Sequence, residues 1–211
     1  MRNPTPNYEG RNEFEWEAAF KKGDKLAHSY FELLTQYGDY PENRSIIEST
    51  IDQKYNNLEE FLESDLILAE EEQSFAEQFS EPSEIEIEEE IKAFETSPIY
   101  NRLKVTSLGW CNVLTLLLTA ENKEYGLKVL YYLGRALATT ICAMSSDAEK
   151  SGIIAFRKRT LSYLNTCTGL IQKIILNTPN HKNILETVIS QVTMIHELTA
   201  DQLFGDKKNS Q

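Results

Sequence analysis

The chain has 211 residues, of which 41% are hydrophobic and 26% charged, and its formal net charge is −12. This composition excludes a disordered chain and is typical of a globular protein. Nine glycines and six prolines are too few for the many turns of an all-β protein. We therefore expect an all-α fold of six to seven helices in a single domain over 12–204, between a mobile arm over 1–11 and a frayed tail over 205–211.

Two long helices are predicted in the N-terminal half. Apolar residues spaced by three and four favour a first helix over 13–37, which Gly38 should cap at its C-terminal end. A second helix over 42–79 has apolar residues close to a heptad repeat. Together these helices should form a long hairpin.

The stretch SEPSEIEIEEEIKAFETSP at 80–98 is rich in glutamate. It could be an internal acidic tail, a carboxylate cluster for a metal or catalysis, or the solvated side of a helix. Ser83 and Glu86 form a capping box that favours a helix start. Three apolar side chains then share one helical face: Ile87, Ile91 and Phe94. We predict a short amphipathic helix here, with a sub-boundary between the hairpin and the rest of the chain near 80–97.

The C-terminal half should form a bundle of about four helices, over 99–120, 125–144, 146–177 and 182–204. Ser97 and Pro98 mark the start of the first of these helices, and Gly205 should end the last. The helix at 99–120 is apolar on nearly all sides, so we expect it in the centre of the bundle. The side chains expected to be buried there are Trp110, Leu114 and Leu117.

The run LLLTAENKEYGLKVLYYLGRALA at 116–138 contains Leu-Thr, Tyr-Gly-Leu and Arg-Ala in that order. It resembles the small bacterial four-helix-bundle proteins encoded in ribosomal RNA intervening sequences. The similarity ends at 139–146, where TTICAMSS stands in place of the Asn-Ile-Ala-Glu-Gly of that family. The resemblance implies a bundle fold and no particular activity.

Charge is distributed unevenly along the chain. Residues 1–100 hold 25 acidic and 8 basic side chains, whereas residues 101–211 hold 8 acidic and 13 basic ones. A negative net charge repels phosphate backbones, so we expect no nucleic-acid partner. The basic run at Arg157, Lys158 and Arg159 is either a patch for an anion or an acidic partner, or an ordinary solvated helix surface.

Motifs for catalysis and metal binding are absent from the sequence. The chain has no Glu-x-x-His, no His-Glu-x-x-His, no Gly-x-Ser-x-Gly and no P-loop. Glu60-x-x-Glu63 is one half of a two-part magnesium motif, and the other half, Glu-x-x-Asp, does not occur. We therefore expect no metal and no cofactor. His196, on the apolar side of the last helix, is a candidate for a ligand site or else a partly buried histidine.

Cysteine usage and hydropathy favour the cytoplasm. Cys111, Cys142 and Cys167 are an odd number without a CxxC motif, and each lies in an apolar helical stretch, so we expect buried reduced thiols. The N-terminal residues lack the apolar core of a signal peptide. The longest apolar run, at 105–120, is shorter than the ~20 residues that span a bilayer. We therefore expect no membrane partner.

The sequence thus predicts a non-enzymatic protein that acts through protein–protein interaction or regulation, including self-association as a homodimer. The alternative is a small-ligand-binding protein or an enzyme with a carboxylate or His196 site in the bundle core. A pocket with convergent polar groups would favour the alternative. A broad apolar patch at the surface would favour interaction with a protein.

Overall fold

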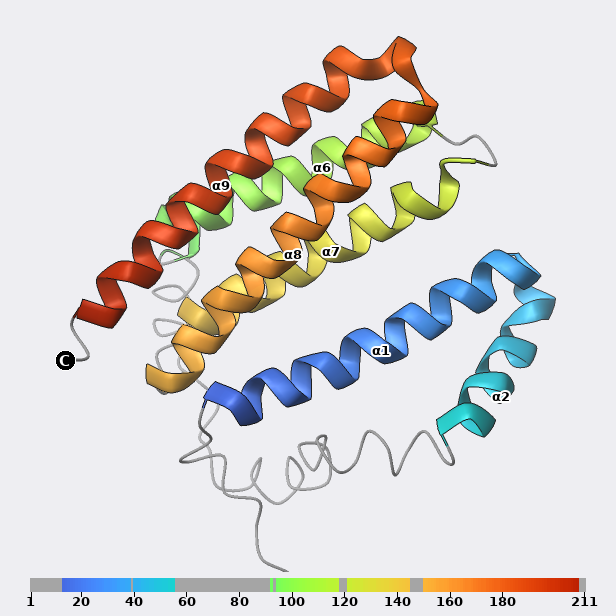
Figure 1. Ribbon diagram of the computed structural model, residues 1–211, viewed down its shortest axis with the longest axis horizontal. Helices are drawn as coiled ribbons and strands as arrows, with labels where there is room; N and C mark the ends of the chain where they lie inside the picture. The colour runs from blue at the N-terminus through green and yellow to red at the C-terminus, as the bar shows by residue number, and fades with distance from the viewer. Residues whose placement is uncertain are drawn as a thin grey trace, which may run out of the picture. The chain divides into compact units, whose positions relative to one another are not determined.

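The computed structural model describes residues 13–38, 40–55, 92, 94–117, 121–144 and 150–208. All regular elements in these ranges are helices and none is a strand, so the predicted all-α fold is confirmed (Figure 1). The chain divides into two compact units. The first unit comprises residues 1–10 and 17–89, and the second comprises residues 11–16 and 90–211.

The described part of the first unit is a helical hairpin. Helix α1 spans Glu13–Tyr37, its first four residues belonging to the second unit, and the short 3₁₀ helix η1 (Pro41–Asn43) leads into α2 (Arg44–Tyr55). Gly38 ends α1 as predicted: its φ is +79°, and its N–H donates to the Leu34 carbonyl at 2.9 Å. The predicted continuation of the second helix over 56–79 lies outside the described residues.

Polar and apolar contacts join α1 to α2. The Ser29 and Tyr55 hydroxyls lie 2.7 Å apart, and Lys54 Nζ donates to Ser29 Oγ at 3.0 Å. Ile47 and Ile51, one turn apart on α2, are both buried. Their spacing of four places them on one face of the helix, as the sequence pattern predicts.

The second unit contains a four-helix bundle. Its helices are α6 (Pro98–Leu117), α7 (Lys123–Met144), α8 (Lys150–Asn177) and α9 (Lys182–Lys208), with the 3₁₀ helix η2 (Pro179–His181) before the last. Each helix packs against the next, and α9 closes the bundle by packing against α6 (Figure 1). The largest fully buried side chains come from all four helices and include Trp110, Leu133, Tyr163, Ile171 and Ile195.

Local hydrogen bonds fix the ends of the bundle helices. The Tyr100 N–H donates to Ser97 Oγ at 3.3 Å, so Ser97 is the predicted N-cap of α6. The buried Asn122 side chain donates to Thr178 Oγ1 at 2.7 Å and thereby links the start of α7 to the end of α8.

Helix α9 does not end at Gly205, as the sequence predicts, but continues to Lys208. A glycine within a helix weakens it by only ~1 kcal/mol and does not stop it.

The position predicted for α6 is correct for one face and wrong for the other. Trp110, Leu114 and Leu117 are buried, as predicted. However, Val105, Leu108 and Leu116 are 69%, 61% and 55% exposed, so α6 is not surrounded on all sides. A helix in a four-helix bundle contacts its two neighbours and the core along one stripe, and the opposite side has no helix to cover it.

Two further sequence predictions concern the cysteines and the acidic helix. Cys167 is buried, but Cys111 and Cys142 are exposed, so the prediction that all three thiols are buried is wrong. They lie beside the apolar stripes of α6 and α7 rather than within them. Of the predicted acidic helix, Phe94 is half-buried with its ring 5.8 Å from that of Tyr100. Ile87 and Ile91 lie outside the described residues.

Candidate functional site

A groove runs along the surface of the second unit between α6 and α9. Its volume is about 540 Å³. We call it the α6–α9 groove and define it by its lining residues, which are Asn101, Arg102, Val105, Thr106, Gly109 and Val113 from α6 and Ile184, Thr187, Val188 and Gln191 from α9. The walls are therefore mostly apolar or neutral.

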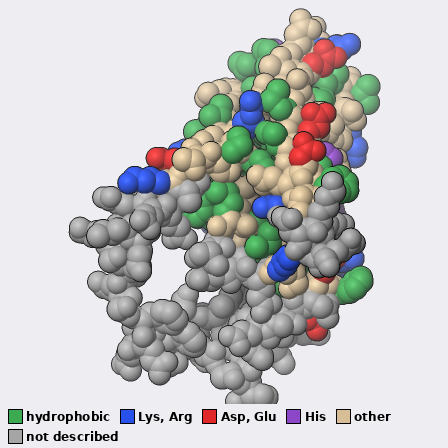
Figure 2. Space-filling model, turned by 90° about the vertical axis from the view of Figure 1, so that its left-hand side faces the viewer, with side chains coloured by type: hydrophobic (Ala, Val, Ile, Leu, Met, Phe, Trp, Pro, Cys, Tyr) green, Lys and Arg blue, Asp and Glu red, His purple; other side chains and the backbone are tan. Residues whose placement is uncertain are grey.

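Helical spacing explains why these side chains form a groove. Val105, Gly109 and Val113 recur every four residues and so line one side of α6. Ile184 and Val188 do the same on α9. Gly109 leaves the floor open, because a Cβ atom at this position would have no neighbour within 4 Å. On α6, the side chains of Val105, Val113 and the exposed Leu116 form an apolar surface. Hydrophobic side chains reach the surface of the described part in Figure 2 as well.

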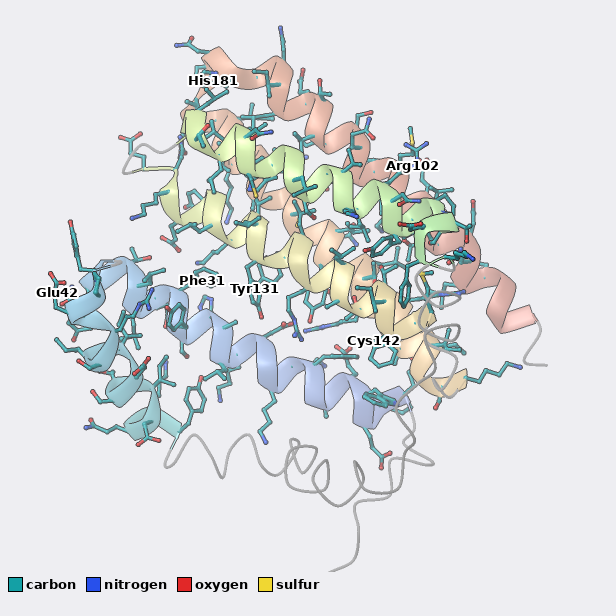
Figure 3. All side chains as sticks on the ribbon, turned by 180° about the vertical axis from the view of Figure 1, so that it is seen from behind. Phe31, Glu42, Arg102, Tyr131, Cys142 and His181 are labelled. Carbon is teal, nitrogen blue, oxygen red and sulfur yellow. The ribbon has the colours of Figure 1, made fainter. Side chains whose placement is uncertain are left out.

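Arg102 is the only ionisable side chain among the described residues that line the groove. It lies near the N-terminal end of α6 beside α9 (Figure 3). Arg102 is exposed and forms no ion pair within the described ranges. The groove lining offers no acid–base pair and no nucleophilic thiol. Its chemistry is that of an apolar binding surface with a positive charge at one end.

The predicted basic run does not form one patch. Arg159 is only 7% exposed, and its guanidinium lies 4.9 Å from the centre of the Tyr163 ring. Lys158 pairs with Glu13, within the second unit. Arg157 is half-buried and has contacts of its own. Successive residues of a helix point about 100° apart, which separates these three side chains.

Arg159 instead belongs to an arginine–tyrosine cluster between α7 and α8. The Arg135 guanidinium lies 5.7 Å from the Tyr163 ring and donates to its hydroxyl at 3.3 Å. The rings of Tyr132 and Tyr163 are 5.8 Å apart. Burial raises the pKa of Tyr131 and of Tyr132, so both phenols are neutral near pH 7. The cluster joins the two helices through cation–π and ring contacts.

The sequence does not reveal this cluster, because Arg135 and Arg159 are 24 positions apart and only the packing of α7 on α8 brings them to one ring. The sequence does not reveal the α6–α9 groove either. Its only signal for the groove is the surplus of apolar residues on α6 together with Gly109. The same surplus is typical of a helix in the centre of a bundle, so it does not distinguish a groove from a buried face.

His196 is half-buried on α9 and does not line the groove. No group of three or more His, Cys, Asp or Glu side chains converges on a possible metal position in the part of the chain that the structure describes. Glu60 and Glu63 lie outside that part. Among the described residues, His196 therefore belongs to no metal-binding cluster.

No protein-family model matches the chain, and no curated protein or solved structure is significantly similar to it. The partial resemblance to the intervening-sequence bundle proteins is thus a similarity of local pattern. A separate observation concerns membranes: none of the helices within the described ranges is both long and apolar enough to span a bilayer.

Proposed function

We propose that this protein is a non-catalytic interaction module whose α6–α9 groove binds a helix of a protein partner. The observation that carries the proposal is the groove itself, an apolar channel between two helices whose lining residue Val105 is largely exposed. Exposed apolar surface with a polar margin is typical of sites that bind other proteins. An apolar groove between two helices suits the apolar face of a third.

The lining residues also favour binding over catalysis. Proton transfer needs an acid or base within hydrogen-bond reach of the substrate, and nucleophilic catalysis needs an activated side chain. Arg102 supplies neither function, because an arginine side chain has only hydrogen-bond donors and no acceptor or nucleophilic atom. The expected partner is a protein and not a nucleic acid, since the net charge of the whole chain is −12. The proposal includes a reducing cytoplasmic location for the complex.

Filling the groove tests this proposal. Replacing Gly109 by Phe places an aromatic ring on the open floor without a backbone clash, and it should abolish partner binding. The matched control is Gly134→Phe on α7, because Gly134 is also an exposed helical glycine with no atom within 4 Å of a Cβ. Partners of the wild type and both variants are compared by quantitative affinity purification, and binding is repeated with the purified partner.

The proposal requires a partner that binds the wild type and Gly134→Phe but not Gly109→Phe. A purified partner that binds all three proteins with equal affinity would place the interaction elsewhere on the molecule. Circular dichroism shows whether both variants keep the helical content of the wild type.

A small amphiphilic carboxylate is the second candidate ligand. The groove volume of about 540 Å³ falls within the roughly 300–1,000 Å³ of small-ligand pockets, and Arg102 could bind a carboxylate. Mass spectrometry of an organic extract of the purified protein separates the two candidates. A stoichiometric lipid, absent from the Gly109→Phe variant, would favour the small ligand.

A further inference from the structure

We propose that the α6–α9 groove selects an acidic amphipathic helix, which carries apolar side chains along one face and, at one end of that face, an aspartate or glutamate that pairs with Arg102. This inference rests on the proposed function and adds the chemical class of the partner. It is carried by the distribution of charge along α6 and by the register of the apolar side chains in the groove.

The groove has a positive charge at one end that no described residue of this protein compensates. Helix α6 contains no acidic residue, and its only ionisable groups besides Cys111 and Tyr100 are Arg102 and Lys104. The Lys104 ammonium lies 5.9 Å from the centre of the Tyr100 ring, so it already has a favourable neighbour. No described residue forms an ion pair with Arg102, and the α9 residues that line the groove are uncharged.

A carboxylate is the group that this environment favours. The planar guanidinium of arginine donates two parallel hydrogen bonds to a carboxylate, which fixes both position and charge. An apolar helix lying in the groove would also exclude water from one side of Arg102, and a guanidinium covered in this way without an anion is unfavourable. A basic residue at the same place would add repulsion.

The register of the groove defines the length of the partner helix. From Arg102 to Val113 the α6 backbone rises by roughly 16 Å, which is about three helical turns. Val105 and Val113 on α6 and Ile184 and Val188 on α9 offer apolar contacts along this length. A matching helix presents apolar side chains at positions i, i+4 and i+7, with the carboxylate about one turn beyond an end of this series.

A displayed library of helices tests the charge preference with the full-length protein. The library encodes helices of about four turns in which three positions on one face vary among apolar residues. The flanking position at each end of that face varies among Glu, Gln and Lys. Selection on the wild type should enrich Glu at one flanking position, and selection on Arg102→Glu should enrich Lys there. The control variant Lys104→Glu, on the other side of α6, should keep the preference for Glu.

The best helix is then synthesised with Glu, Gln or Lys at the selected position. Exposed ion pairs contribute up to about 1 kcal/mol, so Glu→Gln should weaken binding about three- to fivefold at low salt, and Glu→Lys should weaken it further. The difference between the Glu and Gln peptides should shrink at high salt, because salt screens the charge and leaves the apolar contacts intact.

The outcomes separate this inference from the proposed function. Helices that bind the wild type but not Gly109→Phe, with no preference for Glu, would overturn the inference and leave the proposed function intact. If no helix binds the wild type better than Gly109→Phe, both fail. A wild type that dimerises in sedimentation, while Gly109→Phe stays monomeric, would assign the groove to a second copy of this chain and overturn the inference.

Discussion

Gly109 and Arg102 give the α6–α9 groove its two distinguishing properties. Gly109 has no side chain and opens the floor, and Arg102 places a charge at one end of apolar walls. Neither property follows from residue type alone. Gly134 is an equally exposed helical glycine outside the groove, and Arg159, whose type predicts a solvated or anion-binding side chain, is buried against Tyr163.

The three thiols should differ sharply in reactivity, because the thiolate is the reactive form. Burial raises the pKa of Cys167 to about 12, so only about one molecule in 10,000 carries this thiolate at pH 8. Although Cys142 is exposed as a residue, partial desolvation of its thiol also raises the pKa of that group. We therefore expect N-ethylmaleimide to label Cys111 first and Cys142 more slowly, and Cys167 only after denaturation, as peptide mass spectrometry would show. Labelling of Cys167 in the folded protein as fast as Cys111 would contradict its burial.

At the scale of elements, the sequence could predict helices in both units because their signals are local. Ser97 caps α6, Gly38 ends α1, and apolar residues spaced by three and four mark the buried faces. The open side of α6 could not be predicted in this way. Val105 and Leu108 are as apolar as the buried Leu114, and only the number of neighbouring helices decides which of them is covered.

The difference in stability between the buried and the exposed side of α6 can be measured by mutation. Leu114 packs against Gly126, where a Cβ would collide with its Cδ1, and Trp110 Nε1 donates to the Gly126 carbonyl at 2.9 Å. Leu114→Ala should lower the free energy of unfolding by about 2–5 kcal/mol. Leu116→Ala, on the exposed side of the same helix, should change it by less than about 0.5 kcal/mol.

Urea unfolding followed by tryptophan fluorescence measures both values. Adding Gly126→Ala to Leu114→Ala should cost less than Gly126→Ala alone, because the shorter side chain leaves room for the new methyl group. Equal losses from Leu114→Ala and Leu116→Ala would mean that α6 does not pack through Leu114.

At the scale of the whole molecule, the candidate site combines segments that are distant in sequence. Val105 and Val188 line the same groove only because α9 closes the bundle against α6, and no local pattern encodes that closure. The charge asymmetry between the two halves of the chain can be read from the sequence. It does not show that Arg102 lies at one end of an apolar channel and forms no ion pair with any described residue. The all-α class was therefore predictable, whereas the position of the groove was not.

The central claim is that a protein partner binds in the α6–α9 groove, and site-specific photo-crosslinking in the native cell tests it most directly. A benzophenone amino acid replaces Val105 in the groove or, as the control, Leu176 on α8, which is even more exposed at 81%. We predict a covalent adduct with another protein from position 105, mapped to a helix of that protein and lost when Gly109→Phe is added. We predict no such adduct from position 176. The same adducts from both positions, or none from position 105, would contradict the account.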